Sequence, residues 1–87
     1  MIERSFTIEN ERGLGAREAV MLANTASSFS CEIMISAGKM TGNAKSLLSI
    51  LMLGVKCGEE ISIKIIGADE LQASIAISQL LSNGFSE

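Results

Sequence analysis

Two short segments of this 87-residue chain hold the residues that could bind or carry a charged group. The first is residues 13–18, Gly-Leu-Gly-Ala-Arg-Glu, which leads into a predicted helix. Free N–H groups at a helix start attract anions, glycines let a ligand approach the backbone, and Arg17 could add a bidentate donor. Glu18 opposes this, because a carboxylate in the first turn suits the helix dipole itself and competes for Arg17. The spacing alone favours a flexible turn followed by an exposed arginine.

The second segment, residues 43–55, places Ser46 immediately before a short apolar stretch. An N-cap serine accepts a hydrogen bond from the first helical turn. If phosphorylated, it would put about −1.5 to −2 charges on the positive end of the helix dipole without refolding the chain. Leu47, Leu48, Leu51 and Met52 are more large apolar side chains than so short a helix can bury on one face. The exposed ones would form a docking surface beside a switchable charge. The alternative is an ordinary N-cap on a core helix.

Histidine is absent from the chain and cysteine occurs twice. The absence excludes phosphohistidine, histidine-based general base catalysis and the usual zinc sites. Cys31 and Cys57 form no C-x-x-C pair, so we expect two reduced thiols without a chemical role. A disulfide, or a redox-sensing thiol at Cys57, is the alternative. We expect a non-catalytic protein without metal or cofactor.

Charge and hydropathy exclude two further classes. The net charge is −3, basic and acidic residues are mixed, and the three phenylalanines are scattered, so direct nucleic-acid binding is not expected. No apolar run approaches the roughly 20 residues of a transmembrane helix. The start, Met1-Ile2-Glu3-Arg4, lacks the apolar centre of a signal peptide, so we expect a cytoplasmic protein. Residues 1–87 are expected to form a single domain with one modest core.

The elements that must position the two segments follow from periodicity. Alternation predicts strands around Phe6 and Ile8, around Ile33 and Ile35, and over residues 61–65, with residues 39–43 as a hairpin partner after the Ala37-Gly38 turn. Helical spacing predicts helices over residues 16–28 and 47–53, the second stopped by Gly54. The last helix should be capped by Asp69 with support from Gln72, and Gly84 should end it. Its buried stripe should comprise Ala73, Ile77, Leu80 and Leu81.

The predicted order is β-α-β-β-α-β-α. Four strands with one apolar face need a cover, which the helices can supply on one side. The fold class is therefore α+β: an open-faced β-sandwich in which three helices cover one face of a four-stranded antiparallel sheet.

Both segments resemble one family, the histidine-containing phosphocarrier HPr. Residues 13–19 resemble its active-site motif G-[LI]-H-[AT]-R-P-A. Residues 43–55, Asn-Ala-Lys-Ser-Leu-Leu-Ser-Ile-Leu-Met-Leu-Gly-Val, resemble its regulatory-serine segment N-x-K-S-[IL]-[LM]-x-[IVL]-[LM]-x-L-[GA]-[IV]. The separation of the two also matches, as does the entry into the last helix at residues 68–70. The resemblance spans essentially the whole chain and implies the HPr fold.

The resemblance implies a carrier of the phosphoenolpyruvate-dependent sugar phosphotransferase system, whose histidine takes a phosphoryl group from enzyme I and passes it to sugar-specific enzymes. In many Gram-positive bacteria an ATP-dependent HPr kinase/phosphorylase also modifies the serine, here Ser46, and the product binds the catabolite control protein, a transcription regulator. The departures lie at one site: Gly15 replaces the histidine and Glu18 the proline. Asn43, Lys45 and Ser46 match. Such a chain resembles the catabolite-repression HPr-like proteins (Crh type), which commonly carry glutamine at the histidine position.

The leading hypothesis is a non-catalytic regulator of carbon catabolite repression in the bacterial cytoplasm. Ser46 would be phosphorylated by the HPr kinase/phosphorylase, and the product would bind the catabolite control regulator. The alternative is an adaptor that binds enzyme I or a sugar transporter component and competes with a true carrier. An active phosphocarrier is disfavoured because Gly15 has no imidazole. The expected partner-binding residues are Arg17, Lys45, Leu47, Leu48 and Leu51.

Overall fold

The computed structural model describes residues 1–86, and within them the predicted element order is confirmed. Alternating residues form the strands and helically spaced residues form the helices, as expected from the two periodicities. The elements are β1 (Ile2–Thr7), α1 (Ala16–Ser27), β2 (Glu32–Ala37), β3 (Met40–Asn43), α2 (Leu47–Met52), β4 (Glu60–Ile66) and α3 (Glu70–Ser82).

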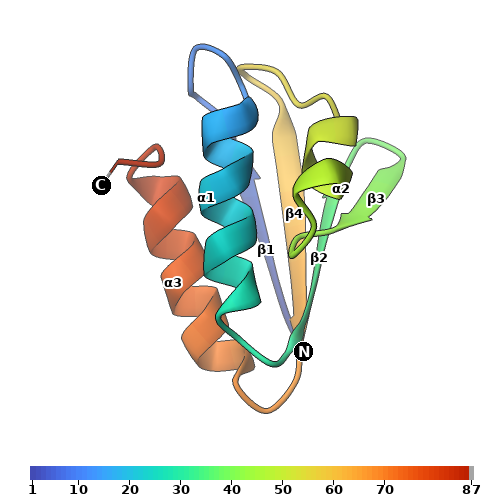
Figure 1. Cartoon of the computed structure of the whole chain (residues 1–87), viewed down its shortest axis with the longest axis vertical. Helices are drawn as coiled ribbons and strands as arrows, with labels where there is room; N and C mark the ends of the chain where they lie inside the picture. The colour runs from blue at the N-terminus through green and yellow to red at the C-terminus, as the bar shows by residue number, and fades with distance from the viewer. Residues whose placement is uncertain (87) are drawn as a thin grey trace.

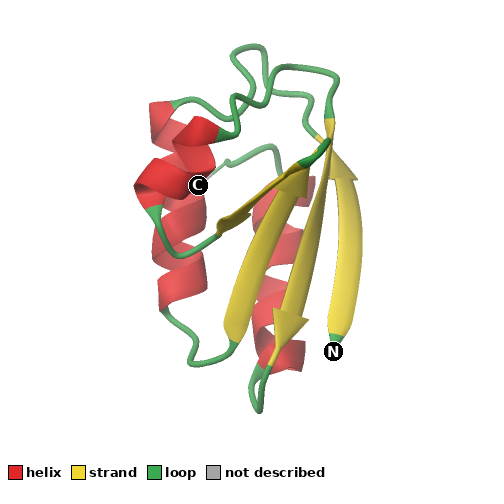
Figure 2. Cartoon of the chain, turned by 90° about the vertical axis from the view of Figure 1, so that its right-hand side faces the viewer, coloured by secondary structure: helices red, strands yellow, loops and turns green. Residues whose placement is uncertain are grey.

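The strands form one antiparallel sheet in the order β1-β4-β2-β3. Figure 2 shows the helices on one side of this sheet, which leaves the other side uncovered. Figure 1 shows α1 beside α3 over the sheet, with α2 near the β2–β3 hairpin. A two-residue turn joins that hairpin, and its first residue, Gly38, has a φ of 59°, which suits such turns. The predicted α+β open-faced sandwich is therefore confirmed.

The core lies between the sheet and the helices. Isoleucines on alternate positions of β2 and β4 are buried to 1 % exposure or less, and Leu22 of α1 is fully buried. Burying each such side chain stabilises the fold by about 1.5–3 kcal/mol. The expected stripe on α3 is confirmed in part, because Ala73 and Ile77 are buried while Leu80 and Leu81 are only partly buried against the core.

Asp69 occupies the predicted N-cap position of the last helix, but the predicted side-chain cap and its support from Gln72 are wrong. Asp69 precedes α3, but its side chain makes no capping hydrogen bond. One carboxylate oxygen accepts hydrogen bonds from the Ser30 N–H (2.9 Å) and hydroxyl (3.2 Å), and the other accepts from the Cys31 N–H (2.9 Å). Asp69 thus ties the α1–β2 connection to the start of α3. Glu70, not Gln72, bonds back, accepting from the Gly67 N–H at 3.0 Å.

This arrangement predicts a pH-dependent contribution from Asp69. Hydrogen bonds from the Ser30 N–H and then from Cys31 lower the pKa of Asp69 from 3.8 to about 2. A depressed folded-state pKa stabilises the fold above the unfolded-state value, and this contribution is lost as pH falls toward 2. Asp69→Asn should lower the melting temperature by roughly 5 °C at neutral pH. Thermal unfolding followed by circular dichroism should show the difference from wild type shrinking between about pH 5 and pH 2. A constant difference would contradict this account.

Neither a membrane-spanning helix nor a metal-binding cluster occurs in the part of the chain that the structure describes. No helix there is long and apolar enough to cross a membrane. No group of three or more His, Cys, Asp or Glu side chains there could hold a metal ion. Cys31 is buried, which raises the pKa of its thiol, whereas Cys57 is exposed, and both are free cysteines.

Candidate functional site

Ser46 is the N-cap of α2, as predicted. Its backbone is extended, and its hydroxyl accepts a hydrogen bond from the Ser49 N–H at 3.2 Å. The Ser46 carbonyl accepts the next helical bond, from the Ile50 N–H at 3.1 Å. An N-cap hydrogen bond of this kind contributes about 1 kcal/mol. The hydroxyl therefore lies at the positive end of the α2 dipole, where added negative charge is favourable.

The apolar side chains after Ser46 are largely exposed, as expected. Only Ile50 of α2 is buried. We call the exposed side chains of this helix the α2 patch; they are Leu47 (41 % exposed), Leu48 (67 %), Leu51 (38 %) and Met52 (65 %). Contiguous apolar side chains on a short surface helix are typical of a contact surface for a partner.

The residues before Ser46 brace the α2 N-terminus against α1. The Asn43 side-chain oxygen accepts a hydrogen bond from the Lys45 N–H at 2.9 Å. The Lys45 ammonium donates to the Phe29 carbonyl at 2.6 Å, beyond the C-terminal end of α1, where a cation suits the helix dipole. Lys45, predicted as a partner-binding residue, thus has an internal partner for its charge.

Gly15 is the N-cap residue of α1 and has an ordinary extended backbone. Its φ of −77° is one that any residue adopts, so the backbone does not require glycine here. A β-carbon at residue 15 would lie 3.2 Å from Glu18 Oε1 and 3.9 Å from the Arg12 carbonyl. The glutamate side chain therefore lies against the space that a side chain at residue 15 would enter. Glu18 is only 9 % exposed, and α1 has no side-chain cap of its own.

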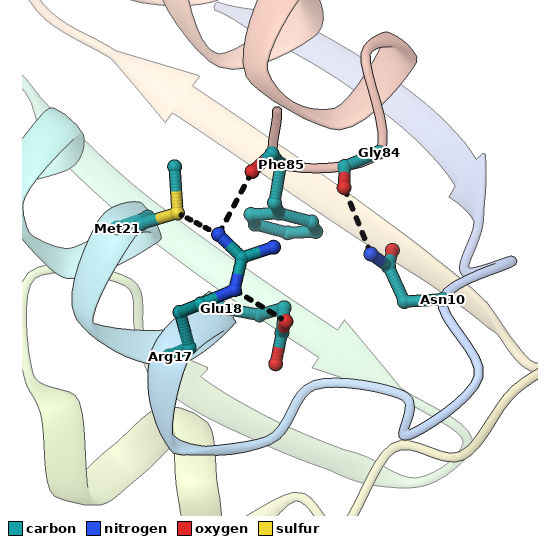
Figure 3. A network of polar contacts seen from close by, with 6 residues as sticks. All are labelled: Asn10, Arg17, Glu18, Met21, Gly84 and Phe85. Atoms are coloured by element: carbon teal, nitrogen blue, oxygen red, sulfur yellow. Dashed lines mark hydrogen bonds and ion pairs between the residues drawn. The ribbon is translucent and has the colours of Figure 1, made fainter. Parts of the chain in front are cut away.

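Arg17 is held by three groups of its own chain (Figure 3). Its Nε lies 3.3 Å from Glu18 Oε2, and its Nη1 donates to the Phe85 carbonyl at 3.1 Å and to the Met21 sulfur at 3.1 Å. Beside it, Asn10 Nδ2 donates to the Gly84 carbonyl at 2.8 Å. Two side chains from the region around the start of α1 therefore fasten the C-terminal turn.

The C-terminal turn buries Phe85, a residue to which the sequence alone assigned no role. Gly84 ends α3 as predicted, with a φ of 61°, and the Phe85 N–H bonds to the Leu80 carbonyl at 2.9 Å. Phe85 is fully buried at a φ of 63°. An apolar residue directly after a C-terminal glycine often packs back on the helix, so the signal was present in the Gly84-Phe85 pair.

A close backbone contact connects the two candidate segments. The Leu14 N–H donates to the Val55 carbonyl at 3.0 Å, so the loop before α1 rests on the chain that leaves α2. Ser46 lies at the other end of the helix pair, where the Ser27 hydroxyl is 3.5 Å from the Lys45 carbonyl. Ten residues of helix separate Arg17 from Ser27, about 15 Å along the axis. Arg17 and Ser46 thus lie toward opposite ends of the α1–α2 pair rather than in one cluster.

Comparison with known proteins identifies the family. The family model described as "PTS HPr component phosphorylation site" matches residues 2–83. Phosphocarrier protein HPr of Treponema pallidum is 32 % identical over 100 % of this chain and 99 % of the relative, and that of Xylella fastidiosa is 36 % identical over 100 % and 98 %. The crystal structure of HPr-C-His from Thermoanaerobacter tengcongensis superposes with a TM-score of 0.95 at 37 % identity, over 100 % and 98 %. The Bacillus subtilis protein Crh matches at 0.75 and 23 % over 100 % of both chains, which shows the fold alone.

Proposed function

This chain belongs to the HPr family of non-catalytic phosphocarrier proteins, and on that premise we propose that it is a regulatory member that carries no phosphate on histidine. The absence of phosphate transfer on histidine is inferred from the chemistry of the residues present. The chain contains no histidine, and the residue in the matching position of the motif, Gly15, has no side chain. Without an imidazole there is no ring nitrogen at this position to accept the phosphoryl group. What remains is the surface of a phosphocarrier without its carrier chemistry.

We further propose that Ser46 is the regulated residue, phosphorylated by the HPr kinase/phosphorylase. The single observation that carries this proposal is the placement of the Ser46 hydroxyl on the α2 N-cap directly beside the exposed α2 patch. Phosphate oxygens could replace the hydroxyl as acceptor for the Ser49 N–H, so the helix would persist. The modification would add about −1.5 to −2 charges at this end of the molecule. The product is a folded protein with an apolar patch next to a new anion.

A surface of this kind fits a partner that offers apolar contact and basic groups together. We assign this role to the catabolite control transcription regulator, which the resemblance implies, and place the protein in carbon catabolite repression in the bacterial cytoplasm. In this proposal Leu47, Leu48 and Leu51 supply apolar contact beside Lys45. Arg17 lies toward the opposite end of the helix pair and is not part of this contact. Charge complementarity would raise the association rate and set specificity, while the buried apolar contact would supply affinity.

The decisive experiment is phosphorylation by the HPr kinase/phosphorylase with ATP, read by intact mass. Wild type should gain one phosphate and Ser46→Ala none. Loss of the N-cap costs only about 1 kcal/mol, so the variant should remain folded. Ser49→Ala is the matched control, because the cap uses the backbone N–H of Ser49 and not its hydroxyl. It should gain one phosphate, as wild type does. The proposal is wrong if wild type gains none, or if Ser46→Ala gains as much as wild type.

A second function is favoured by the exposure of the α2 patch in the unmodified chain. An adaptor that binds enzyme I or a sugar transporter component through Leu47, Leu48 and Leu51 needs no phosphate on Ser46. It would compete with a true carrier for the same partners. If the kinase adds no phosphate to wild type, the regulator is excluded and the adaptor, which does not require phosphorylation of Ser46, is the function that is left.

A further inference from the structure

The start of α1 is a helix N-terminus, which favours negative charge, and the chain places a carboxylate of its own there. The N-cap residue, Gly15, has no side chain that could accept a hydrogen bond from the first-turn N–H groups. Glu18 lies in the same turn, and only 9 % of this residue is exposed. A carboxylate at that place interacts favourably with the helix dipole.

The neighbouring cation is also occupied. Arg17 Nε pairs with Glu18 at 3.3 Å, and Nη1 is shared between the Phe85 carbonyl and the Met21 sulfur. Figure 3 shows the guanidinium between the Glu18 carboxylate and the Phe85 carbonyl. Charge-assisted hydrogen bonds of this kind are about twice as strong as neutral ones, so an external anion at Nε or Nη1 would have to displace them. The Arg17 side chain is 58 % exposed, so Nη2 is the part of the guanidinium that stays open to solvent.

The missing side chain at residue 15 belongs to the same arrangement. Glu18 Oε1 lies 3.2 Å from the position of a β-carbon at residue 15, tighter than ordinary van der Waals contact. Glycine is therefore the residue that leaves the glutamate undisturbed, although the backbone would admit others. A β-carbon at residue 15 would require the end of the Glu18 side chain to shift by a few tenths of an ångström, and the Glu18 carboxylate is in turn paired with Arg17.

We propose that Glu18 is a built-in anion that closes the start of α1 to phosphate. The chain thereby neutralises Arg17 and fastens its C-terminal turn without any ligand. The inference rests on the proposed function and deepens its non-carrier part. It gives a reason why the start of α1 would not bind even free inorganic phosphate. It does not depend on Ser46, so this inference and the kinase experiment succeed or fail separately.

Titration with inorganic phosphate tests the closure, with the backbone amide resonances of residues 15–19 and the Arg17 Nε–H as the readout. Glu18→Ala should show saturable shifts at these resonances. Wild type should show none at concentrations that saturate the variant, a difference in affinity of at least about tenfold, or about 1.4 kcal/mol. An unchanged overall spectrum of Glu18→Ala establishes that the variant is folded.

Glu11→Ala is the matched control, because Glu11 is an exposed carboxylate in the loop before α1 and its removal changes the net charge equally. It should behave as wild type. The closure is overturned if wild type binds phosphate as tightly as Glu18→Ala, or if Glu18→Ala shows no saturable shift. It is also overturned if Glu11→Ala opens the site equally, since net charge and not the position of Glu18 would then govern binding.

Discussion

Gly15→His alone is expected to accept phosphate from phosphoenolpyruvate and enzyme I far less efficiently than Gly15→His combined with Glu18→Ala. The imidazole of the single variant would begin from a β-carbon 3.2 Å from a carboxylate oxygen. The phosphoryl group would then add negative charge beside a buried glutamate whose arginine partner is already engaged. Like charges at close range in a partly buried site oppose each other by more than 1.4 kcal/mol, so the initial rates should differ by more than about tenfold.

Intact mass after incubation with phosphoenolpyruvate and enzyme I measures this directly. Wild type should gain no phosphate, because it has no histidine. Gly15→His with Glu11→Ala is the charge-matched control and should behave as Gly15→His alone. Equal rates for Gly15→His with and without Glu18 would show that the carboxylate is no obstacle.

Features of the fold set by neighbours along the chain could be predicted from sequence. The Ser46 cap, the end of α2 near Gly54 and the hairpin at residues 37–40 each depend on residues within a few positions. The alternating isoleucines likewise determine which face of the sheet is buried. Exposure of the α2 patch followed from the shortness of its helix, because one turn and a half cannot bury four large side chains on a single face.

Features set by tertiary contact could not be predicted. Asp69 has the sequence context of an N-cap, yet two backbone N–H groups 38 and 39 residues away compete successfully for its carboxylate. Capping propensity is a local preference that such contacts override. In the candidate site, Glu18 could be recognised as a competitor for Arg17 from their adjacency. The bond from Arg17 to the Phe85 carbonyl joins residues 68 positions apart and needs the packed fold to be seen.

Gly13→Ala should be among the most destabilising single substitutions in the chain, because two costs coincide there. Gly13 has a φ of 65°, which costs a residue with a β-carbon about 1–2 kcal/mol. That β-carbon would also lie 2.2 Å from the Val55 carbonyl oxygen and 2.7 Å from Lys56 Cα. Both are backbone atoms, so relief requires moving the loop that holds Leu14 to Val55. Overpacking of this kind adds about 1–3 kcal/mol, which brings the expected loss to about 3 kcal/mol or more.

Gly38→Ala separates the two costs, because Gly38 has a similar φ of 59° but open space around its missing β-carbon. It should lose only the conformational part, about 1–2 kcal/mol. For a domain of this size 1 kcal/mol shifts the melting temperature by about 4–8 °C, so Gly13→Ala should melt at least about 12 °C below wild type. Urea unfolding at equilibrium gives the free energies directly. If the two variants lose equal stability, the contact between the loop before α1 and the exit of α2 is not tight.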